Sequence, residues 1–317
     1  MTRALRKAVI AAGVALLPAA GMIGAAGVAG AAVTPNASYA NSYAAPYLEL
    51  SDSSVGDLAA DMKASGDKYY TLAFLIPKSG CTAQWEDGGY SVGSFKSQIS
   101  ALQAAGGNVI ISFGGAEGGE LAKTCTSASG LQAAYANIVN TYNVKRLDFD
   151  IEGGPLDDTA SISRRNTALA ALQKADPSVQ VDYTLPVDPS GLEGNALNLL
   201  KDAKSKGVKV NLVNIMTMDF GDGENAYNDA ISGANATHGQ LASIYSGTSS
   251  AQQWHLLGIT PIAGKNDDNE NFTQANATSL ESFAASKGVQ ELSFWEVDSY
   301  DKKVGYAYSK TFTKITG

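Results

Sequence analysis

Three acidic residues alternate with three large apolar residues in the segment 147–152, which reads Leu-Asp-Phe-Asp-Ile-Glu. Successive side chains of a β-strand point to opposite faces, so Asp148, Asp150 and Glu152 share one face. Neighbouring carboxylates on that face lie about 7 Å apart and raise one another's pKa. A row of this kind suits acid–base chemistry on a bound substrate. A solvated strand is the alternative, but the Gly-Gly-Pro run at 153–155 indicates a buried parallel strand that ends in a loop.

The strand that carries these acids belongs to a regular succession of strands and helices. Short apolar runs predict eight strands, and the stretches between them predict helices. The predicted strands are Ala45–Leu50, Tyr69–Ile76, Asn108–Phe113, Arg146–Glu152, Val179–Leu185, Leu212–Met218, Leu256–Pro261 and Glu291–Trp295. The predicted helices are Val55–Ser65, Ser94–Ala105, Gly130–Tyr142, Thr159–Ala175, Asn195–Lys206, Asn225–Tyr245, Gln274–Lys287 and Lys302–Phe312.

This alternation predicts a single-domain α/β fold, a (β/α)8 TIM barrel over residues 45–317. No Pro/Ser-rich linker divides the succession of elements. An open, doubly wound sheet is the competing fold. It usually carries a glycine-rich phosphate loop after its first strand, and no such loop is found here.

Unusual residues stand where several predicted strands end, which is the edge that carries the chemistry of such barrels. The third strand ends in Gly114-Gly115, the sixth in Asp219 and the eighth in Trp295, and Asn266 follows the seventh. Each has a structural alternative: a tight turn for the glycines, a helix cap for Asp219 and ordinary core for Trp295. Together, on one face of one barrel, they favour a carbohydrate pocket.

Residues 1–32 have the pattern of a signal peptide. Three basic residues precede an apolar stretch at 8–17, and small residues lead to an Ala-x-Ala-like cleavage site near Ala32. We therefore expect a secreted, extracellular protein. A membrane anchor is the weaker alternative because the stretch has few large apolar residues. Residues 33–44 are expected to form a flexible mature N-terminus.

The net charge of the chain limits the kinds of molecule that the protein is expected to bind. The chain holds 23 Lys and Arg against 31 Asp and Glu, and without the basic residues of the leader 20 remain against 31, a net charge of −11. Such a protein is a poor ligand for nucleic acid and for anionic membranes, whereas a neutral polysaccharide meets no such penalty. We expect a monomer.

The two cysteines, Cys81 and Cys125, predict one disulfide in an exported protein, and two free buried thiols are the alternative. The two histidines, His238 and His255, are not in metal-ligand spacing with other candidate ligands. No metal or cofactor is therefore expected.

With these residues in view, the chain resembles the family 18 glycoside hydrolases, the chitinase family, and most closely their compact secreted bacterial members. The last five positions of the family's fourth-strand motif, Asp-Gly-x-Asp-x-Asp-x-Glu, are matched at 148–152. The third-strand Ser-x-Gly-Gly is matched at 112–115, the sixth-strand Met-x-Tyr-Asp at 216–219 with one exception, and the eighth-strand tryptophan by Trp295. The resemblance covers essentially the whole chain after the leader.

The resemblance implies hydrolysis of β-1,4 bonds between N-acetylglucosamine units of chitin or chitooligosaccharides, by retaining, substrate-assisted catalysis. Glu152 would protonate the leaving oxygen and later activate water. Asp150 would orient the substrate's acetamido group, whose oxygen attacks the anomeric carbon, and Asp148 would share a proton with Asp150. The residues expected to bind substrate are Gly114, Gly115, Tyr183, Met216, Met218, Asp219, Asn266 and Trp295.

Two positions depart from the family's pattern. Lys145 and Arg146 replace the Asp and Gly that open the fourth-strand motif, and we expect only a structural effect there. Met218 replaces a tyrosine whose hydroxyl helps to hold the acetamido group, and methionine has no such donor. Either another hydroxyl, such as that of Tyr183, takes its place, or activity is reduced.

Two rival functions fit the same fold. An endo-β-N-acetylglucosaminidase that cleaves N-glycan cores would keep the chemistry and change the substrate. A lectin-like or weakly active chitin-binding protein would keep the barrel and lose the reaction. Such proteins typically lose the acid, which is present here as Glu152.

Overall fold

The computed structural model of the protein describes residues 37–51, 58–117, 119–221, 223 and 226–316. The predicted signal peptide, and the first residues of the helix predicted from Val55, lie outside the described residues.

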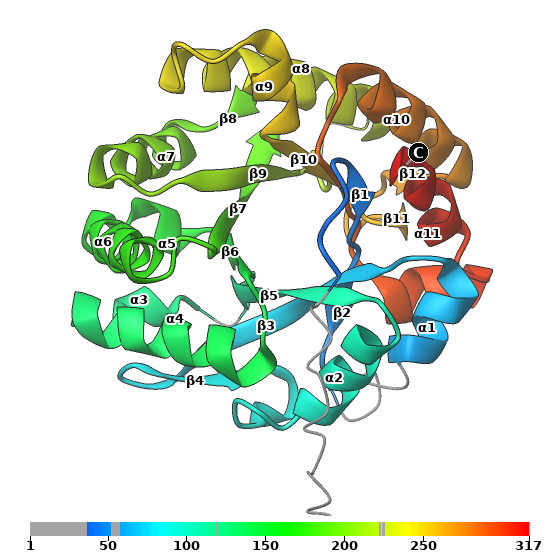
Figure 1. Cartoon of the computed structure of the whole chain (residues 1–317). Helices are drawn as coiled ribbons and strands as arrows, with labels where there is room; N and C mark the ends of the chain where they lie inside the picture. The colour runs from blue at the N-terminus through cyan, green and yellow to red at the C-terminus, as the bar shows by residue number, and fades with distance from the viewer. Residues whose placement is uncertain (1–36, 52–57, 118, 222, 224–225, 317) are drawn as a thin grey trace, which may run out of the picture. The chain divides into compact units, whose positions relative to one another are not determined.

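Parallel strands form a barrel with helices on its outside, as Figure 1 shows, and this confirms the predicted fold. The strands of the barrel are β1 (Tyr43–Ala44), β2 (Tyr47–Glu49), β3 (Tyr69–Ser79), β5 (Asn108–Gly114), β6 (Arg146–Asp150), β7 (Gln180–Asp188), β9 (Val210–Met216), β10 (Leu257–Thr260) and β13 (Glu291–Leu292). Their order in the sheet is β1-β13-β10-β9-β7-β6-β5-β3-β2.

The first barrel strand is interrupted, and its two halves close the barrel. β1 pairs with β13, with Tyr43 opposite Glu291, whereas β2 pairs with β3, with Tyr47 opposite Thr71. Pro46 stands between the halves and has no N–H to donate, although its carbonyl still accepts from Thr71 N at 3.0 Å. β1 and β2 together therefore connect β13, the last barrel strand, to β3.

Helices follow the strands in sequence and cover the barrel. They are α1 (Leu58–Ser65), α2 (Lys96–Ala104), α3 (Leu121–Thr124), α4 (Ala128–Tyr142), α5 (Gly154–Asp157), α6 (Thr159–Ala175), α7 (Gly194–Lys206), α8 (Ala226–Ile244), α9 (Ser250–His255), α10 (Gln274–Lys287) and α11 (Ala307–Phe312). Short additional elements are β4 (Thr82–Trp85), β8 (Gly191–Leu192), β11 (Gly264–Lys265), β12 (Asn271–Phe272), η1 (Asp87–Gly89), η2 (Val297–Asp301), η3 (Lys302–Val304) and η4 (Thr313–Thr316). No helix in the described part of the chain combines the length and the apolar character needed to cross a membrane.

Local sequence explains where several helices begin and end. The Asp158 side chain accepts a hydrogen bond from Ser161 N and caps the start of α6. Gly207, with φ of 82°, ends α7 in the left-handed conformation that glycine adopts easily. The single helix predicted over Lys302–Phe312 is wrong, because Gly305 and Tyr306 both adopt positive φ and separate η3 from α11.

The alternation along β6 is as predicted. Phe149 points outward and stacks against Phe113 from β5, with ring centroids 5.2 Å apart, and also contacts Tyr135 from α4. Asp148 and Asp150 lie on the opposite face, inside the barrel, and both are buried. The apolar face thus anchors β6 under the helices, and the acidic face is left to the interior.

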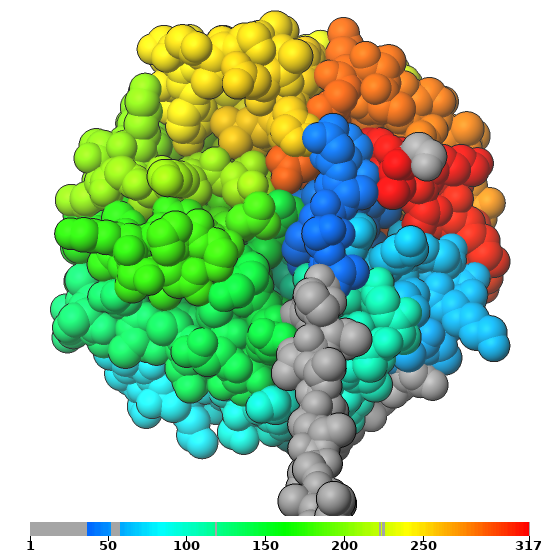
Figure 2. Space-filling view, in the orientation of Figure 1, coloured from blue at the N-terminus to red at the C-terminus, as the bar shows by residue number. Residues whose placement is uncertain are grey.

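The segment 37–44 corrects the expectation of a flexible N-terminus. Tyr43 is buried in β1, Tyr39 donates to the carbonyl of Val109 at 2.8 Å, and Ser38 accepts from the Tyr69 hydroxyl at 2.8 Å. In Figure 2 the N-terminal segment, in blue, lies across the centre of this face of the molecule. Tyrosine rings and main-chain hydrogen bonds therefore hold this segment against the barrel.

Candidate active site

Asp148 is the innermost acid of the row and is held by three hydroxyl groups. Ser112 Oγ and Tyr47 OH donate to its Oδ2 at 2.6 and 3.1 Å, and Thr184 Oγ1 donates to its Oδ1 at 2.8 Å. Burial raises the pKa of Asp148 to about 7, although these hydrogen bonds oppose the rise. This carboxyl group can therefore gain or lose a proton near neutral pH.

Asp150 and Glu152 form the outer pair. Burial, followed by the charges of Glu152 and Asp148, raises the pKa of Asp150 well above its ordinary value. Burial also raises the pKa of Glu152, while a hydrogen bond from Asp150 lowers it. The protonation of each carboxyl group of this pair therefore depends on that of the other. That Asp150 shares a proton with Asp148, as the resemblance implies, stays a prediction.

A cavity of about 300 Å³ opens above this pair, and both acids line it. Its aromatic wall consists of Tyr47, Phe74 and Trp295. The rings of Phe74 and Trp295 are nearly parallel, at 9°, with centroids 5.6 Å apart. An apolar ring beside two carboxyl groups is a surface on which a sugar can stack while its glycosidic oxygen meets the acids.

The end of β9 supplies the opposite wall. Met216, Met218 and Asp219 all line the cavity, as the resemblance implies. Asp219 has a φ of 51°, and its Oδ1 accepts from the backbone N–H groups of Asp267 and Asp268 at 2.7 and 3.2 Å. Burial raises the pKa of Asp219. Asp219 therefore faces the cavity and also fixes the loop that follows β11.

The lack of a side chain at Gly114 and Gly115 lets the Asp150 carbonyl and the Phe74 ring approach the backbone closely. A Cβ on Gly114 would lie 2.0 Å from the carbonyl oxygen of Asp150, and one on Gly115 would lie 2.6 Å from the ring of Phe74. The N–H of Gly115 donates to that same carbonyl at 3.1 Å. The glycines therefore bring the end of β5 against the end of β6, and so position the strand that carries the acids.

Tyr183 and Asn266, like Gly114 and Gly115, are predicted substrate-binding residues that do not line the first cavity. Tyr183 points to the outer face of the barrel, where it packs on Phe149 and donates to Asn166. It cannot replace the missing hydroxyl at Met218, and that expectation was wrong. Asn266 is buried, and neither atom of its side-chain amide has a hydrogen-bond partner among the described residues.

The hydroxyl groups that do line the cavity are already engaged. Tyr47 and Thr184 donate to Asp148, and Thr260 Oγ1 donates to Asn214 Oδ1 at 2.7 Å. The sequence analysis did not single out Tyr47 or Thr184, although each stands on a predicted strand. An inward-facing hydroxyl near the end of a barrel strand was the signal that could have identified them.

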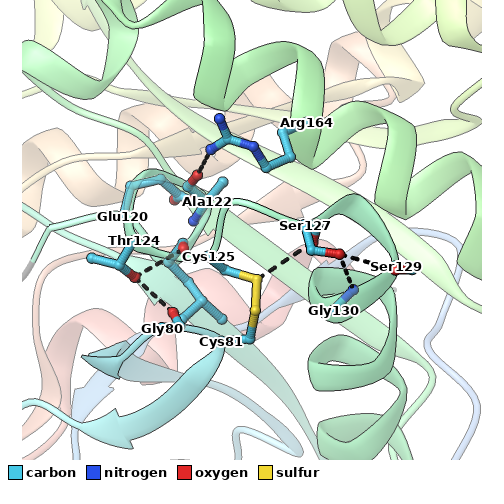
Figure 3. The surroundings of a disulfide bond; sticks show 11 residues. Gly80, Cys81, Glu120, Ala122, Thr124, Cys125, Ser127, Ser129, Gly130 and Arg164 are labelled. Carbon is cyan, nitrogen blue, oxygen red and sulfur yellow. Dashed lines mark hydrogen bonds between the residues drawn. A yellow bond between two sulfur atoms is a disulfide. The ribbon is translucent and has the colours of Figure 1, made fainter.

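A second cavity, of about 430 Å³, meets the first at Glu152. Its described lining includes residues 115–117 and Gly119, Lys123 and Thr124 of α3, and residues 153–155. The predicted disulfide between Cys81 and Cys125 is confirmed, with Cα atoms 4.4 Å apart. Figure 3 shows that it joins the β3–β4 turn to the end of α3, beside a hydrogen bond from Thr124 to Gly80. This bridge secures the rim of the second cavity.

Within the described part of the chain, no group of three or more His, Cys, Asp or Glu side chains is arranged to hold a metal ion.

Curated relatives match most of this chain. The probable bifunctional chitinase/lysozyme of Escherichia coli strain K12 is 35% identical over an alignment of 283 residues, which covers 83% of this chain and 31% of that protein. Endochitinase 11 of Metarhizium anisopliae is 34% identical over 279 residues, which cover 83% of this chain and 53% of that protein. The chain therefore spans about a third and about half of the length of these two relatives.

Solved structures match the fold. Catalytic-site mutants of active domain 2 of the thermostable chitinase from Pyrococcus furiosus, complexed with chito-oligosaccharides, superpose with a TM-score of 0.81 at 31% identity. The match covers 89% of this chain and 97% of that domain. No protein-family model matches the chain.

Proposed function

The chain belongs to the family 18 glycoside hydrolases, and we propose that it hydrolyses β-1,4 bonds between N-acetylglucosamine units of chitin or chitooligosaccharides. The observation that carries the proposal is the placement of the two acids: Asp150 and Glu152 both line the first cavity, and Glu152 also lines the second. The complex of the Pyrococcus furiosus domain with chito-oligosaccharides supports the choice of substrate.

The proposed reaction uses the substrate's acetamido group as the nucleophile. One sugar lies in the first cavity against Trp295, with its acetamido group beside Asp150. The acetamido oxygen attacks the anomeric carbon while Glu152 gives its proton to the departing oxygen. Glu152, now ionised, takes a proton from water as that water opens the cyclic intermediate, and the configuration is retained. The raised pKa of Glu152 favours the protonated form that the first step needs.

The second cavity is assigned to the leaving-group side. It begins at Glu152, whose proton must reach the oxygen between the two sugars, and it extends away from Trp295 along α3. No described residue of its lining is aromatic, in contrast to the first cavity. Polar contacts, from residues such as Lys123 and Thr124, would therefore hold the departing sugar.

The central experiment replaces the acid. Glu152→Gln keeps the shape and removes the proton donor, so hydrolysis of chitohexaose should fall by about 10²–10⁴-fold or more, while binding of the sugar is retained. Glu193→Gln, an exposed change at the start of α7, is the matched control and should leave turnover unchanged. Parent-level turnover in Glu152→Gln would remove Glu152 from the acid role.

The substrate proposal has its own test. N-acetylglucosamine chains should be cleaved, whereas cello-oligosaccharides, which lack the acetamido nucleophile, should not. Release of glycans from glycoprotein without cleavage of chitooligosaccharides would favour the N-glycan endoglycosidase instead. Binding of chitin without turnover would favour the lectin-like alternative.

We also propose that the protein is exported, on the strength of the signal-peptide pattern at 1–32 together with the disulfide. Intact-mass measurement of protein recovered from the culture medium should show loss of the leader. Recovery of the full-length chain from inside the cells alone would contradict export.

A further inference from the structure

A second group of ionisable side chains lies inside the barrel, below the catalytic acids. Asp182 on β7 is the register neighbour of Asp148 on β6. Its Oδ2 lies 3.5 Å from Nε of Arg146, and its Oδ1 accepts from Asn211 at 3.1 Å. Glu291, on β13, is also buried. A column of carboxyl groups thus continues from the active site toward the opposite end of the barrel.

Arg146 occupies a tight site at the base of this column. Its guanidinium lies 4.4 Å from the ring centroid of Tyr39 and 5.1 Å from that of Tyr43, and it donates to the Tyr43 hydroxyl. Its Nε also donates to Gln180 at 3.1 Å. The segment 37–44 therefore covers this cation and keeps it out of water. The position is one at which the chain departs from its family, where the resemblance places a glycine.

Acidic groups outnumber basic groups in this column. Four buried carboxyl groups, those of Asp148, Asp150, Asp182 and Glu291, share the interior with one cation among the described residues, because the other buried arginine, Arg165, lies outside the strands against Tyr183. The groups that face Asp182 are Arg146 and Asp148 from β6, Asn211 from β9, Glu291 from β13 and Tyr39 from the N-terminal segment. Any charge placed at Asp182 therefore acts on Asp148 through a medium from which water is excluded.

We propose, on the basis of the function proposed above, that Asp182 and Arg146 are positioning residues that set the protonation of the catalytic acids from below. The negative charge of Asp182 favours a proton on Asp148 and, by acting directly through the same water-excluded interior, a proton on Asp150 and Glu152. The positive charge of Arg146 limits that effect. The pair thus fixes the pH range in which the outer acids hold the proton that catalysis requires.

The pKa directions agree with this arrangement. Asp182 is among the causes that raise the pKa of Asp148. The pKa of Asp182 itself is raised by burial to about 6, with Arg146 and Asn211 opposing the rise, so it is largely ionised at neutral pH. Burial and then the charge of Asp182 raise the pKa of Glu291 well above its ordinary value, which leaves that group neutral.

The test compares two substitutions that remove charges of opposite sign and should therefore shift the pH profile of kcat in opposite directions. Asp182→Asn removes the negative charge and should move the alkaline limb of kcat on chitohexaose to lower pH by about one unit, a roughly tenfold change in rate on that limb. Arg146→Gln removes the positive charge and should move the same limb to higher pH. Arg146→Lys keeps the positive charge and should show the same pH profile of kcat as the parent protein.

The neighbouring surface ion pair provides the control. Lys145 and Asp176 are 2.9 Å apart but exposed, so Asp176→Asn should leave the pH profile unchanged. Folding of every variant is checked by thermal unfolding. Unchanged profiles in folded Asp182→Asn and Arg146→Gln, or shifts in the same direction, would overturn the proposal.

A substrate-free measurement separates this proposal from the proposed function. In wild-type protein with ¹³C-labelled aspartates, the carboxyl signal of Asp148, assigned with Asp148→Asn, should titrate near neutral pH and respond to ionisation of Asp182. Titration of Asp148 in a single step independent of Asp182 would overturn the proposal even if the enzyme is active. An enzyme that cleaves no chitooligosaccharide would refute the proposed function and leave this measurement to decide the inference.

Discussion

Because β5 and β6 approach each other closely, catalysis should be sensitive to substitution of Gly114, although this residue does not line the cavity. Gly114 is the last residue of β5 and has a φ of 104°. A methyl group added there would lie 2.0 Å from the carbonyl oxygen of Asp150, which is backbone and has no flexible side chain to turn aside. Gly114→Ala must therefore displace the segment that carries Asp150 and Glu152.

Two separate costs follow from this substitution. An alanine at positive φ costs about 1–2 kcal/mol of stability. Relief of the contact to an ordinary separation requires a movement of about 1 Å, and a misplacement of that size in a catalytic group can reduce the rate by about 100-fold. We therefore expect Gly114→Ala to lose about two decades of kcat on chitohexaose while it remains folded at 25 °C.

Gly106 supplies the matched control. It also has a positive φ, of 93°, but a Cβ built there meets nothing within 4 Å. Gly106→Ala should therefore lose stability to a similar extent without losing kcat. Rates are compared at a temperature at which thermal unfolding shows both variants to be native. Equal kcat values in the two variants would refute the view that Gly114 positions the acids.

Three further predictions follow from the buried groups. Tyr183→Phe should leave kcat and KM for chitohexaose unchanged and cost about 1 kcal/mol of stability, because it removes one buried hydrogen bond outside the cavity; a large loss of kcat would contradict this. Burial raises the pKa of Asp67 to about 7, so its native form keeps a proton that the unfolded form loses above about pH 4. The contribution of Asp67 to the free energy of unfolding should therefore fall by about 1.4 kcal/mol for each pH unit between 4 and 7. Chemical denaturation of Asp67→Asn should show a free energy of unfolding that depends less on pH in this range. Replacing Cys81 and Cys125 by serine should lower the free energy of unfolding by about 4 kcal/mol, since the bridge closes a segment of 44 residues, and an unchanged unfolding midpoint would exclude that contribution.

The sequence was sufficient for the barrel and for the row of acids, because both depend on periodicity within single strands. The same alternation would have excluded Tyr183. In the sheet, Asp148 pairs with Asp182 and Asp150 with Thr184, so the inward positions of β7 are those of Asp182 and Thr184. Tyr183 has the hydroxyl group that Met218 lacks, but it lies on the outward face of β7, where that hydroxyl donates to Asn166.

Other features depend on partners far away in the chain. The hydroxyl groups around Asp148 come from three different strands, and their meeting depends on the register between strands, which no local pattern specifies. The docking of residues 37–44 depends on Tyr69 and Val109, so a short polar and aromatic segment looked flexible when considered alone. Asn266 follows a strand and looked accessible, but its loop folds over it.

The divided first strand has a consequence for how the chain can fold. Ser293 donates to the carbonyl of Ala45, 248 residues away, beside the ladder that joins β1 to β13. Bringing such distant ends together costs about 5 kcal/mol of chain entropy, and a growing polypeptide cannot make the contact until its last strand has been synthesised. Until then the sheet is an open ribbon with an unpaired edge at each end, the arrangement most prone to pairing with another chain. The closed barrel therefore depends on the pairing of β1 with β13, and a chain that lacked either strand would leave the sheet open.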